Sequence, residues 1–247
     1  MHLPAPEVGL NTLINVLSSP AHALINSLLE PVELPLMHKL AEAGKPSPWM
    51  FFPTSGVASV IGRGAGNWQE IGVFGREGAG CFSPLLGSDQ SPYTIFMQLP
   101  GRGFRIAADD LLVASAHSAE LRTLLLRYVQ TFITQVSQSA LANAQFNIGQ
   151  RLARWILMIH DRVGGDYVTL THEFLAGMLG VGRTGITLAL HELERLGTIS
   201  MARKRINILD RSKLETMTSS YYGFAEAEYH RLIGQPLSCR EPFGSKV

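Results

Sequence analysis

The residues best suited to chemistry lie in Leu170–Ile199, which reads LTHEFLAGMLGVGRTGITLALHELERLGTI. Helical spacing predicts an outward face consisting of Arg183, Thr184, Thr187, Leu188 and His191. Arg183 can donate two parallel hydrogen bonds to the O6 and N7 atoms of guanine, and the threonines can bond base edges or phosphates. A helix N-terminus adds partial positive charge that favours phosphate. This chemistry is suited to contact with a DNA duplex.

The same segment contains the elements that would position that face. Thr171 stands where a helix cap is expected, and Ala176 is small where two helices must cross closely. Gly180 can adopt the positive φ of a three-residue turn, and Val181 fills that turn from inside. One buried face is predicted, formed by Leu175, Leu179, Ile186, Leu190 and Leu193. Together these features predict a helix-turn-helix whose second helix begins near Arg183.

An apolar–basic–apolar pattern follows this second helix. Ile199–Met201 and Ile206–Leu209 are predicted to form two paired strands, a wing with Arg203, Lys204 and Arg205 at its tip. Basic side chains there can reach phosphates, which supplies affinity without sequence information. The charge balance agrees with phosphate binding by this part of the chain. Residues 147–247 carry 13 basic and 10 acidic side chains, whereas residues 1–146 carry 8 basic and 10 acidic ones.

The first 118 residues contain short apolar runs separated by turn residues. Strands are predicted at Trp49–Phe52, Val57–Ile61, Ile71–Phe74, Tyr93–Leu99 and Phe104–Ala107, with turns at Pro53–Gly56, Gly62–Gly66, Gly87–Asp89 and Pro100–Gly103. Short strands at this spacing are typical of an antiparallel barrel or jelly roll. Residues 10–29 are predicted to be helical and to pack outside the sheet.

Residues 119–146 lack Gly and Pro, which predicts one long helix. One apolar stripe, assigned to a dimer interface, consists of Leu121, Leu125, Tyr128, Phe132, Val136 and Ala140. A second apolar set consists of Leu124, Leu126, Val129 and Ile133. Two stripes indicate packing against both the chain's own domain and a second copy. The alternative is that both stripes serve one monomeric core.

These patterns predict an α+β protein with three parts. They are a jelly-roll sensor domain at 1–118, a dimerisation helix at 119–146 and a winged helix-turn-helix domain at 147–247. Asn147 is expected to cap the helix after the boundary. The chain is 46% hydrophobic and 17% charged, which excludes a disordered or coiled-coil chain. Two separated cysteines, no signal peptide and no membrane span predict a cytoplasmic protein.

Several motifs resemble the Crp–Fnr superfamily of bacterial transcription regulators. They are RLA at Arg151–Ala153, LTHEFLAGMLGVGRTGIT at Leu170–Thr187, ILDR at Ile208–Arg211, FFPTSG at Phe51–Gly56 and GREGAG at Gly75–Gly80. The resemblance implies a cyclic-nucleotide-binding-like sensor domain and a homodimer held by the long helix. It also implies a two-fold symmetric DNA operator and RNA polymerase as a further partner. Motion at the Phe146/Asn147 hinge would set the separation of the recognition helices.

The sensor half departs from the cyclic-nucleotide binders of that superfamily. Those proteins carry Gly-Glu and Arg-Ser/Thr pairs around the phosphate, and the matching positions here are Gly80-Cys81 and Tyr93-Thr94. On the long helix only one hydroxyl, that of Ser137, remains of the pair that contacts the base. We therefore expect these five residues to line an effector pocket that does not take a cyclic nucleotide, and we expect no cofactor or metal. In the recognition helix, Thr184 and Leu188 replace the superfamily's frequent Glu and Arg, so its best-known operator is not expected.

Two other classes of function stay open from the residues alone. A jelly-roll enzyme or small-molecule-binding protein would need clustered His and Glu, but residues 49–107 contain no histidine. A protein-interaction module would not need the basic wing. The sequence also contains no GxSxG elbow, P-loop or HExxH motif, so we expect no enzymatic activity.

Overall fold

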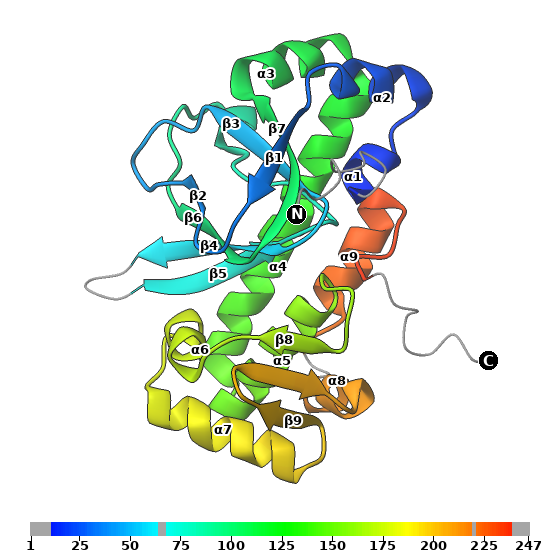
Figure 1. The fold of residues 1–247 in the computed structure, drawn as a ribbon. Coiled ribbons are helices and arrows are strands. Elements are labelled where there is room, and N and C mark those ends of the chain that lie inside the picture. Colours follow the sequence, from blue (N-terminus) through cyan, green and yellow to red (C-terminus); the bar gives the residue numbers. More distant parts are fainter. Residues whose placement is uncertain (1–10, 64–67, 219–220, 239–247) are drawn as a thin grey trace, which may run out of the picture.

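The computed structural model describes residues 11–63, 68–218 and 221–238 (Figure 1). Its N-terminal half consists of two antiparallel sheets. One sheet has the order β1-β7-β3 and the other the order β2-β6-β4-β5. The strands are β1 (Glu30–Leu34), β2 (Lys39–Ala41), β3 (Trp49–Pro53), β4 (Val57–Arg63), β5 (Trp68–Phe74), β6 (Thr94–Leu99) and β7 (Gly101–Ala107). The five strands predicted between residues 49 and 107 are confirmed, and the two short strands β1 and β2 were not predicted.

The predicted turns are partly confirmed. Pro53–Gly56 connects β3 to β4, and Gly56 has a positive φ of 80°. Gly87, also with φ 80°, ends the short 3-10 helix η2 (Ser83–Leu86). The connection at Pro100 is tighter than predicted, because β7 begins at Gly101. The turn Gly62–Gly66 lies partly outside the described residues.

Short helices cover the outside of the sheet β1-β7-β3. The helix predicted for residues 10–29 is two helices, α1 (Thr12–Asn15) and α2 (Ser19–Asn26). Their apolar side chains pack against strand residues such as Phe52 and Ile106. A further helix, α3 (Ala108–His117), follows β7 and was not predicted.

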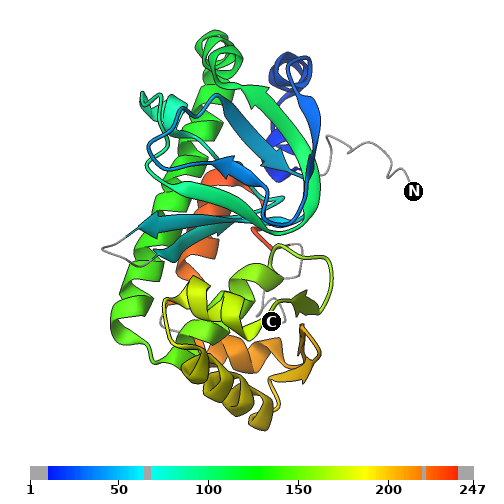
Figure 2. The same cartoon turned by 60° about the vertical axis from the view of Figure 1, so that its left-hand side comes forward.

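The long helix α4 (Ala119–Gln145) is confirmed and runs beside both halves of the molecule (Figure 2). It ends at Phe146, and Asn147 begins α5 (Ile148–His160) as its N-cap. The Asn147 side chain accepts a hydrogen bond from the Gln150 N–H at 3.0 Å, and the Gln150 side chain accepts one from the Asn147 N–H at 3.3 Å. This reciprocal pair fixes the break between the two helices.

The C-terminal half consists of helices around a small sheet. Its helices are α5, α6 (His172–Leu179), α7 (Arg183–Arg195) and α8 (Arg211–Thr218). The sheet has the order β8-β10-β9, with β8 (Tyr167–Thr169), β9 (Ile199–Ala202) and β10 (Arg205–Ile208). The predicted two-stranded wing is therefore part of a three-stranded sheet. The predicted α+β class, with a jelly-roll-like half, a long helix and a helix-turn-helix, is confirmed.

The last described helix, α9 (Phe224–Ile233), leaves the C-terminal half and packs on α4. Tyr229 and Ile233 belong to the same buried cluster as Leu13, Ile14 and Leu121. Figure 1 shows α9 beside α1 and α4 rather than beside α7. The domain limits 1–118, 119–146 and 147–247 thus stay a prediction, and α9 packs on the part assigned to the sensor.

Candidate nucleic-acid interface

The turn between α6 and α7 has the geometry that its residues predict. The Thr171 hydroxyl caps α6 by accepting a hydrogen bond from the Phe174 N–H at 3.2 Å. Gly180 has a φ of 62°, a left-handed conformation that glycine adopts at low cost. The Val181 N–H donates to the Ala176 carbonyl at 3.0 Å, which closes the turn. The five side chains of the predicted inner face, at positions 175, 179, 186, 190 and 193, are all buried.

The outward face of α7 is open to solvent at four of its five predicted positions. The exposed side chains are those of Arg183, Thr184, Leu188 and His191. Gly182 is the N-cap and has no side chain to cap the first turn. The N-terminal N–H groups of α7 therefore keep their partial positive charge for an external anion.

Thr187 is the exception on that face. It is half-buried, and its hydroxyl donates to the Arg183 carbonyl at 3.1 Å. The Nδ1 atom of His172 lies 3.2 Å from the same hydroxyl oxygen, so the imidazole proton is the donor in that second contact. With both roles used inside the protein, the Thr187 hydroxyl is less available to a base edge than predicted.

The wing presents its basic residues at one tight turn. Arg203 and Lys204 join β9 to β10, and both are exposed. Lys204 has a φ of 57°, and its carbonyl accepts a hydrogen bond from the Leu170 N–H at 3.0 Å. The guanidinium of Arg205, on the central strand β10, stacks over the Tyr167 ring of β8 at 3.8 Å.

A groove of about 360 Å³ lies between the start of α6, the start of α7 and the wing. It brings together the predicted residues Thr171, Arg183, Lys204 and Arg205. His172 lines the same groove and was not predicted, although it directly follows the capping Thr171. The wing is held against α7 because the Met201 N–H donates to the Glu194 carboxylate at 2.8 Å. Three cations thus surround one concave surface, an arrangement that suits a phosphate backbone.

The predicted effector residues differ widely in burial. Cys81 is 2% exposed, and burial raises the pKa of its thiol. A Cβ atom at Gly80 would lie 1.9 Å from the Phe74 ring, so that position is filled from inside the core. By contrast, Tyr93 is exposed, and so is Ser137, which donates its hydroxyl to its own helix. Thr94 is half-buried and accepts a hydrogen bond from Ala43. The grouping of these five residues as an effector pocket therefore stays a prediction.

The predicted dimer stripe on α4 is largely buried within the single chain. Leu121, Leu125, Tyr128 and Phe132 are 1 to 5% exposed in the single chain, because they pack against the sheets and the short helices. Val136 is half-buried against the same core, and Ala140 is exposed. The exposed large apolar residues of α4 are Leu126, Ile133 and Leu141, at 44%, 50% and 44%. Two of these three belong to the second apolar set predicted from the sequence.

A buried carboxyl joins the N-terminal half to the helix-turn-helix half. Glu70 of β5 is 8% exposed and accepts hydrogen bonds from Ser59 Oγ at 2.6 Å and from Trp155 Nε1 at 2.7 Å. Burial raises the pKa of Glu70 to about 7, although the two hydrogen bonds and the charges of Arg162 and Arg154 oppose the shift. Trp155 belongs to α5, so this contact ties the hairpin β4–β5 to the other half.

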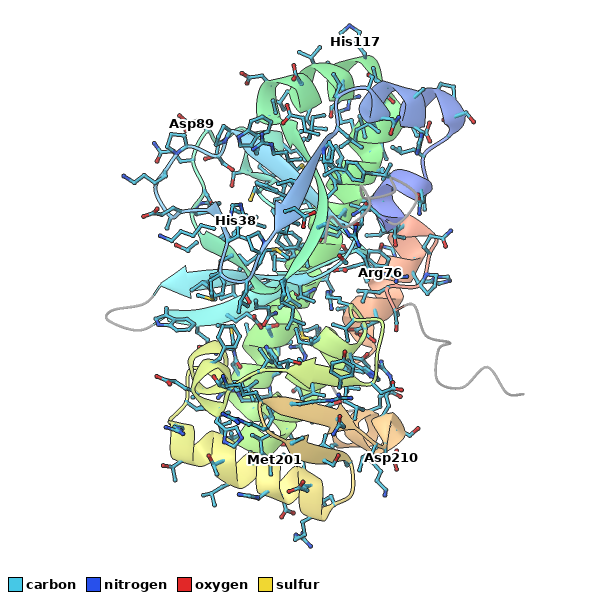
Figure 3. The ribbon with its side chains drawn as sticks, viewed as in Figure 1. His38, Arg76, Asp89, His117, Met201 and Asp210 are labelled. Carbon is cyan, nitrogen blue, oxygen red and sulfur yellow. The ribbon has the colours of Figure 1, made fainter. Side chains whose placement is uncertain are left out.

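A second contact between the halves is a buried ion pair. Arg162 Nε lies 2.8 Å from the Glu77 carboxylate, and both side chains are 1 to 2% exposed. The Tyr229 hydroxyl of α9 donates to the Glu77 carbonyl at 2.5 Å. Rotation of the two halves about the junction at residue 146 would break this ion pair. Figure 3 shows Arg76, the neighbour of Glu77, beside the upper end of α9.

Two further observations limit the chemistry of the described residues. Within the described ranges, no three His, Cys, Asp or Glu side chains gather as a metal site would require. No helix of the described part of the chain is long and apolar enough to cross a membrane.

Comparisons with known proteins agree with the geometry. Residues 150–217 match the Crp-like helix-turn-helix domain family. The transcriptional regulator LdrP of Thermus thermophilus is 27% identical over 135 residues, which is 49% of this chain and 69% of LdrP.

Solved structures share the fold of nearly the whole chain. A protein described as a transcriptional regulator of the Crp/Fnr family from Eubacterium rectale has a TM-score of 0.67 at 20% identity, covering 85% of this chain and 99% of its own. The c-di-GMP-responsive regulator CLP of Xanthomonas campestris has a TM-score of 0.64 at 15% identity, covering 77% and 99%.

The fold and the site define a winged helix-turn-helix DNA-binding protein with an N-terminal jelly-roll-like half. More particularly, residues 150–217 match the Crp-like helix-turn-helix domain family, and the chain is similar in sequence and fold to transcriptional regulators of the Crp–Fnr family.

Proposed function

We propose that this regulator binds a two-fold symmetric operator as a homodimer, with one α7 helix in each of two major grooves. The observation that carries the proposal is the groove between α6, α7 and the wing, where Arg183, Lys204 and Arg205 converge. Arg183 would bond guanine, and the wing would contact the adjacent phosphates. The two recognition helices would lie about 34 Å apart, one turn of the duplex.

The exposed apolar residues of α4 support the choice of dimer surface. Leu126 and Ile133 are seven residues apart, and Ala140 follows at the same interval. A seven-residue spacing keeps side chains on one seam of a paired helix. Exposed leucine and isoleucine on a helix otherwise packed on its own domain suit burial against a second copy.

The sensor input is proposed to be something other than a cyclic nucleotide. Gly80-Cys81 and Tyr93-Thr94 stand where the superfamily has its phosphate-binding pairs, and Cys81 belongs to a buried cluster with Phe51, Phe74 and Phe132. The contacts at Glu70 and at Glu77–Arg162 would couple a change in the sensor half to the position of α7. RNA polymerase is the further partner proposed for a bound dimer.

DNA binding is tested by fluorescence anisotropy with duplexes selected from genomic fragments. We expect Arg183→Ala to weaken binding at least tenfold, since a bidentate guanine contact contributes roughly 1–3 kcal/mol in each of two half-sites. Arg195→Ala is the matched control, because Arg195 lies at the other end of α7 and pairs with Glu192. Equal affinity of the wild type for selected and random duplexes would contradict the proposal.

The dimer surface is tested by sedimentation velocity on full-length protein. Ile133→Asp is expected to give monomers, because two carboxylates would face each other across the seam. Leu86→Asp, at a position 56% exposed on η2, is the control and should leave the dimer intact. A wild-type protein that sediments as a monomer at all concentrations would exclude the dimer.

A further inference from the structure

Leu188 is the most exposed of the large hydrophobic side chains that the structure describes, at 66%. It lies in the middle of the outward face of α7, between Thr184 and His191 along one side of the helix. Figure 1 shows α7 at the lower edge of the molecule, away from both sheets of the N-terminal half. An apolar side chain this exposed gains free energy only when another apolar group covers it.

Part of the hydrogen-bonding capacity beside Leu188 is already engaged within the protein. Thr187 has its hydroxyl engaged with Arg183 and His172. The charged groups of the face stand at its two ends, Arg183 at the N-terminus and Arg195 at the C-terminus. Arg195 is paired with Glu192 at 2.6 Å. The centre of the recognition face is therefore suited to an apolar contact.

The major groove of DNA offers one apolar group on its base edges, the C5 methyl of thymine. We infer that Leu188 is a specificity-determining residue that packs on a thymine methyl in each operator half-site. The inference rests on the proposed function, since it assumes that α7 enters the groove. The inference identifies thymine as a base that α7 recognises beside the guanine that Arg183 would contact.

The experiment replaces single thymines of a selected operator by deoxyuridine, which removes only the methyl group. Affinity is measured by anisotropy for the wild type, Leu188→Ala and the control Leu209→Ala. Leu209 is 61% exposed but lies beyond the wing, after β10. Because a methyl-sized apolar group contributes about 0.8 kcal/mol when buried, we expect deoxyuridine to weaken wild-type binding about fourfold per half-site at one position.

Replacing thymine by deoxyuridine should leave the DNA affinity of Leu188→Ala unchanged. It should weaken the affinity of Leu209→Ala as much as that of the wild type. Replacing that T·A pair by C·G and then methylating the cytosine at C5 should recover about fourfold in affinity for the wild type and for Leu209→Ala, but not for Leu188→Ala. If no thymine position is sensitive to its methyl group, or if Leu188→Ala keeps the sensitivity, the inference is overturned. Absence of any selected operator would instead overturn the proposed function, so the two failures are distinguishable.

Discussion

The buried carboxyl of Glu70 makes the stability of the folded protein depend on pH. The ordinary pKa of this group is 4.5, and the folded protein raises it to about 7, chiefly by burial. Between these two values the folded state binds the proton more tightly than the unfolded state does. The contribution of Glu70 is therefore most favourable below pH 4.5, and it is lost as pH rises towards 7. A shift of this size corresponds to about 3 kcal/mol, at 1.36 kcal/mol per pKa unit.

The substitution Glu70→Gln tests this reasoning because it removes the titration but keeps an oxygen that can accept from Trp155 Nε1. We expect the free energy of unfolding of the variant to fall less than that of the wild type between pH 5 and pH 7.5. Over this pH range the difference between the two slopes should integrate to about 2 kcal/mol, because the remainder of the effect falls outside the range. Other titrating groups are common to both proteins, so their contributions cancel in the difference.

The assay is urea denaturation followed by Trp fluorescence at a series of pH values and constant ionic strength. Glu42→Gln is the control, because Glu42 is an exposed carboxyl. It should reproduce the wild-type slope. Identical pH dependence in the wild type and Glu70→Gln would show that the carboxyl titrates as it does in water, and the reasoning from burial would fail.

The remaining predictions concern the DNA contacts and the contact between the halves. Replacing both Lys204 and Arg205 by Ser should reduce the slope of log affinity against log salt by roughly 2 per half-site, because each phosphate contact contributes about 0.9. Measuring DNA affinity over a series of salt concentrations checks this prediction. An unchanged slope would show that the wing does not contact the DNA phosphates. Glu77→Gln leaves the buried Arg162 without its carboxylate, which should destabilise the fold by about 3 kcal/mol in thermal or urea unfolding. A loss below about 1 kcal/mol would mean that water reaches this ion pair.

Local patterns were sufficient to predict the helix-turn-helix. Each of its features, such as the Thr171 cap and the Gly180 turn, depends on residues only a few positions apart. The strands between residues 49 and 107 were found for the same reason, since glycines and prolines separate short apolar runs. The long helix α4 was predicted because residues 119–146 contain neither glycine nor proline.

The side of α4 that faces its own sheet could not be predicted from periodicity. Leu125 is buried and Ile133 is exposed, yet both belong to apolar stripes with helical spacing, and only the three-dimensional arrangement decides which side chain is covered. The packing of α9 was missed in the same way, although Ala225, Tyr229 and Ile233 recur every four residues. Glu70 and Trp155 are 85 residues apart, so no local pattern indicates that they meet.

The central claim is that α7 of each of two copies enters a major groove. Methylation of guanine N7 by dimethyl sulfate, measured along a selected operator, tests it most directly. The claim predicts two protected guanines about one helical turn apart, with both protections lost in Arg183→Ala. Protection at one site only, or protection that persists in Arg183→Ala, would contradict it.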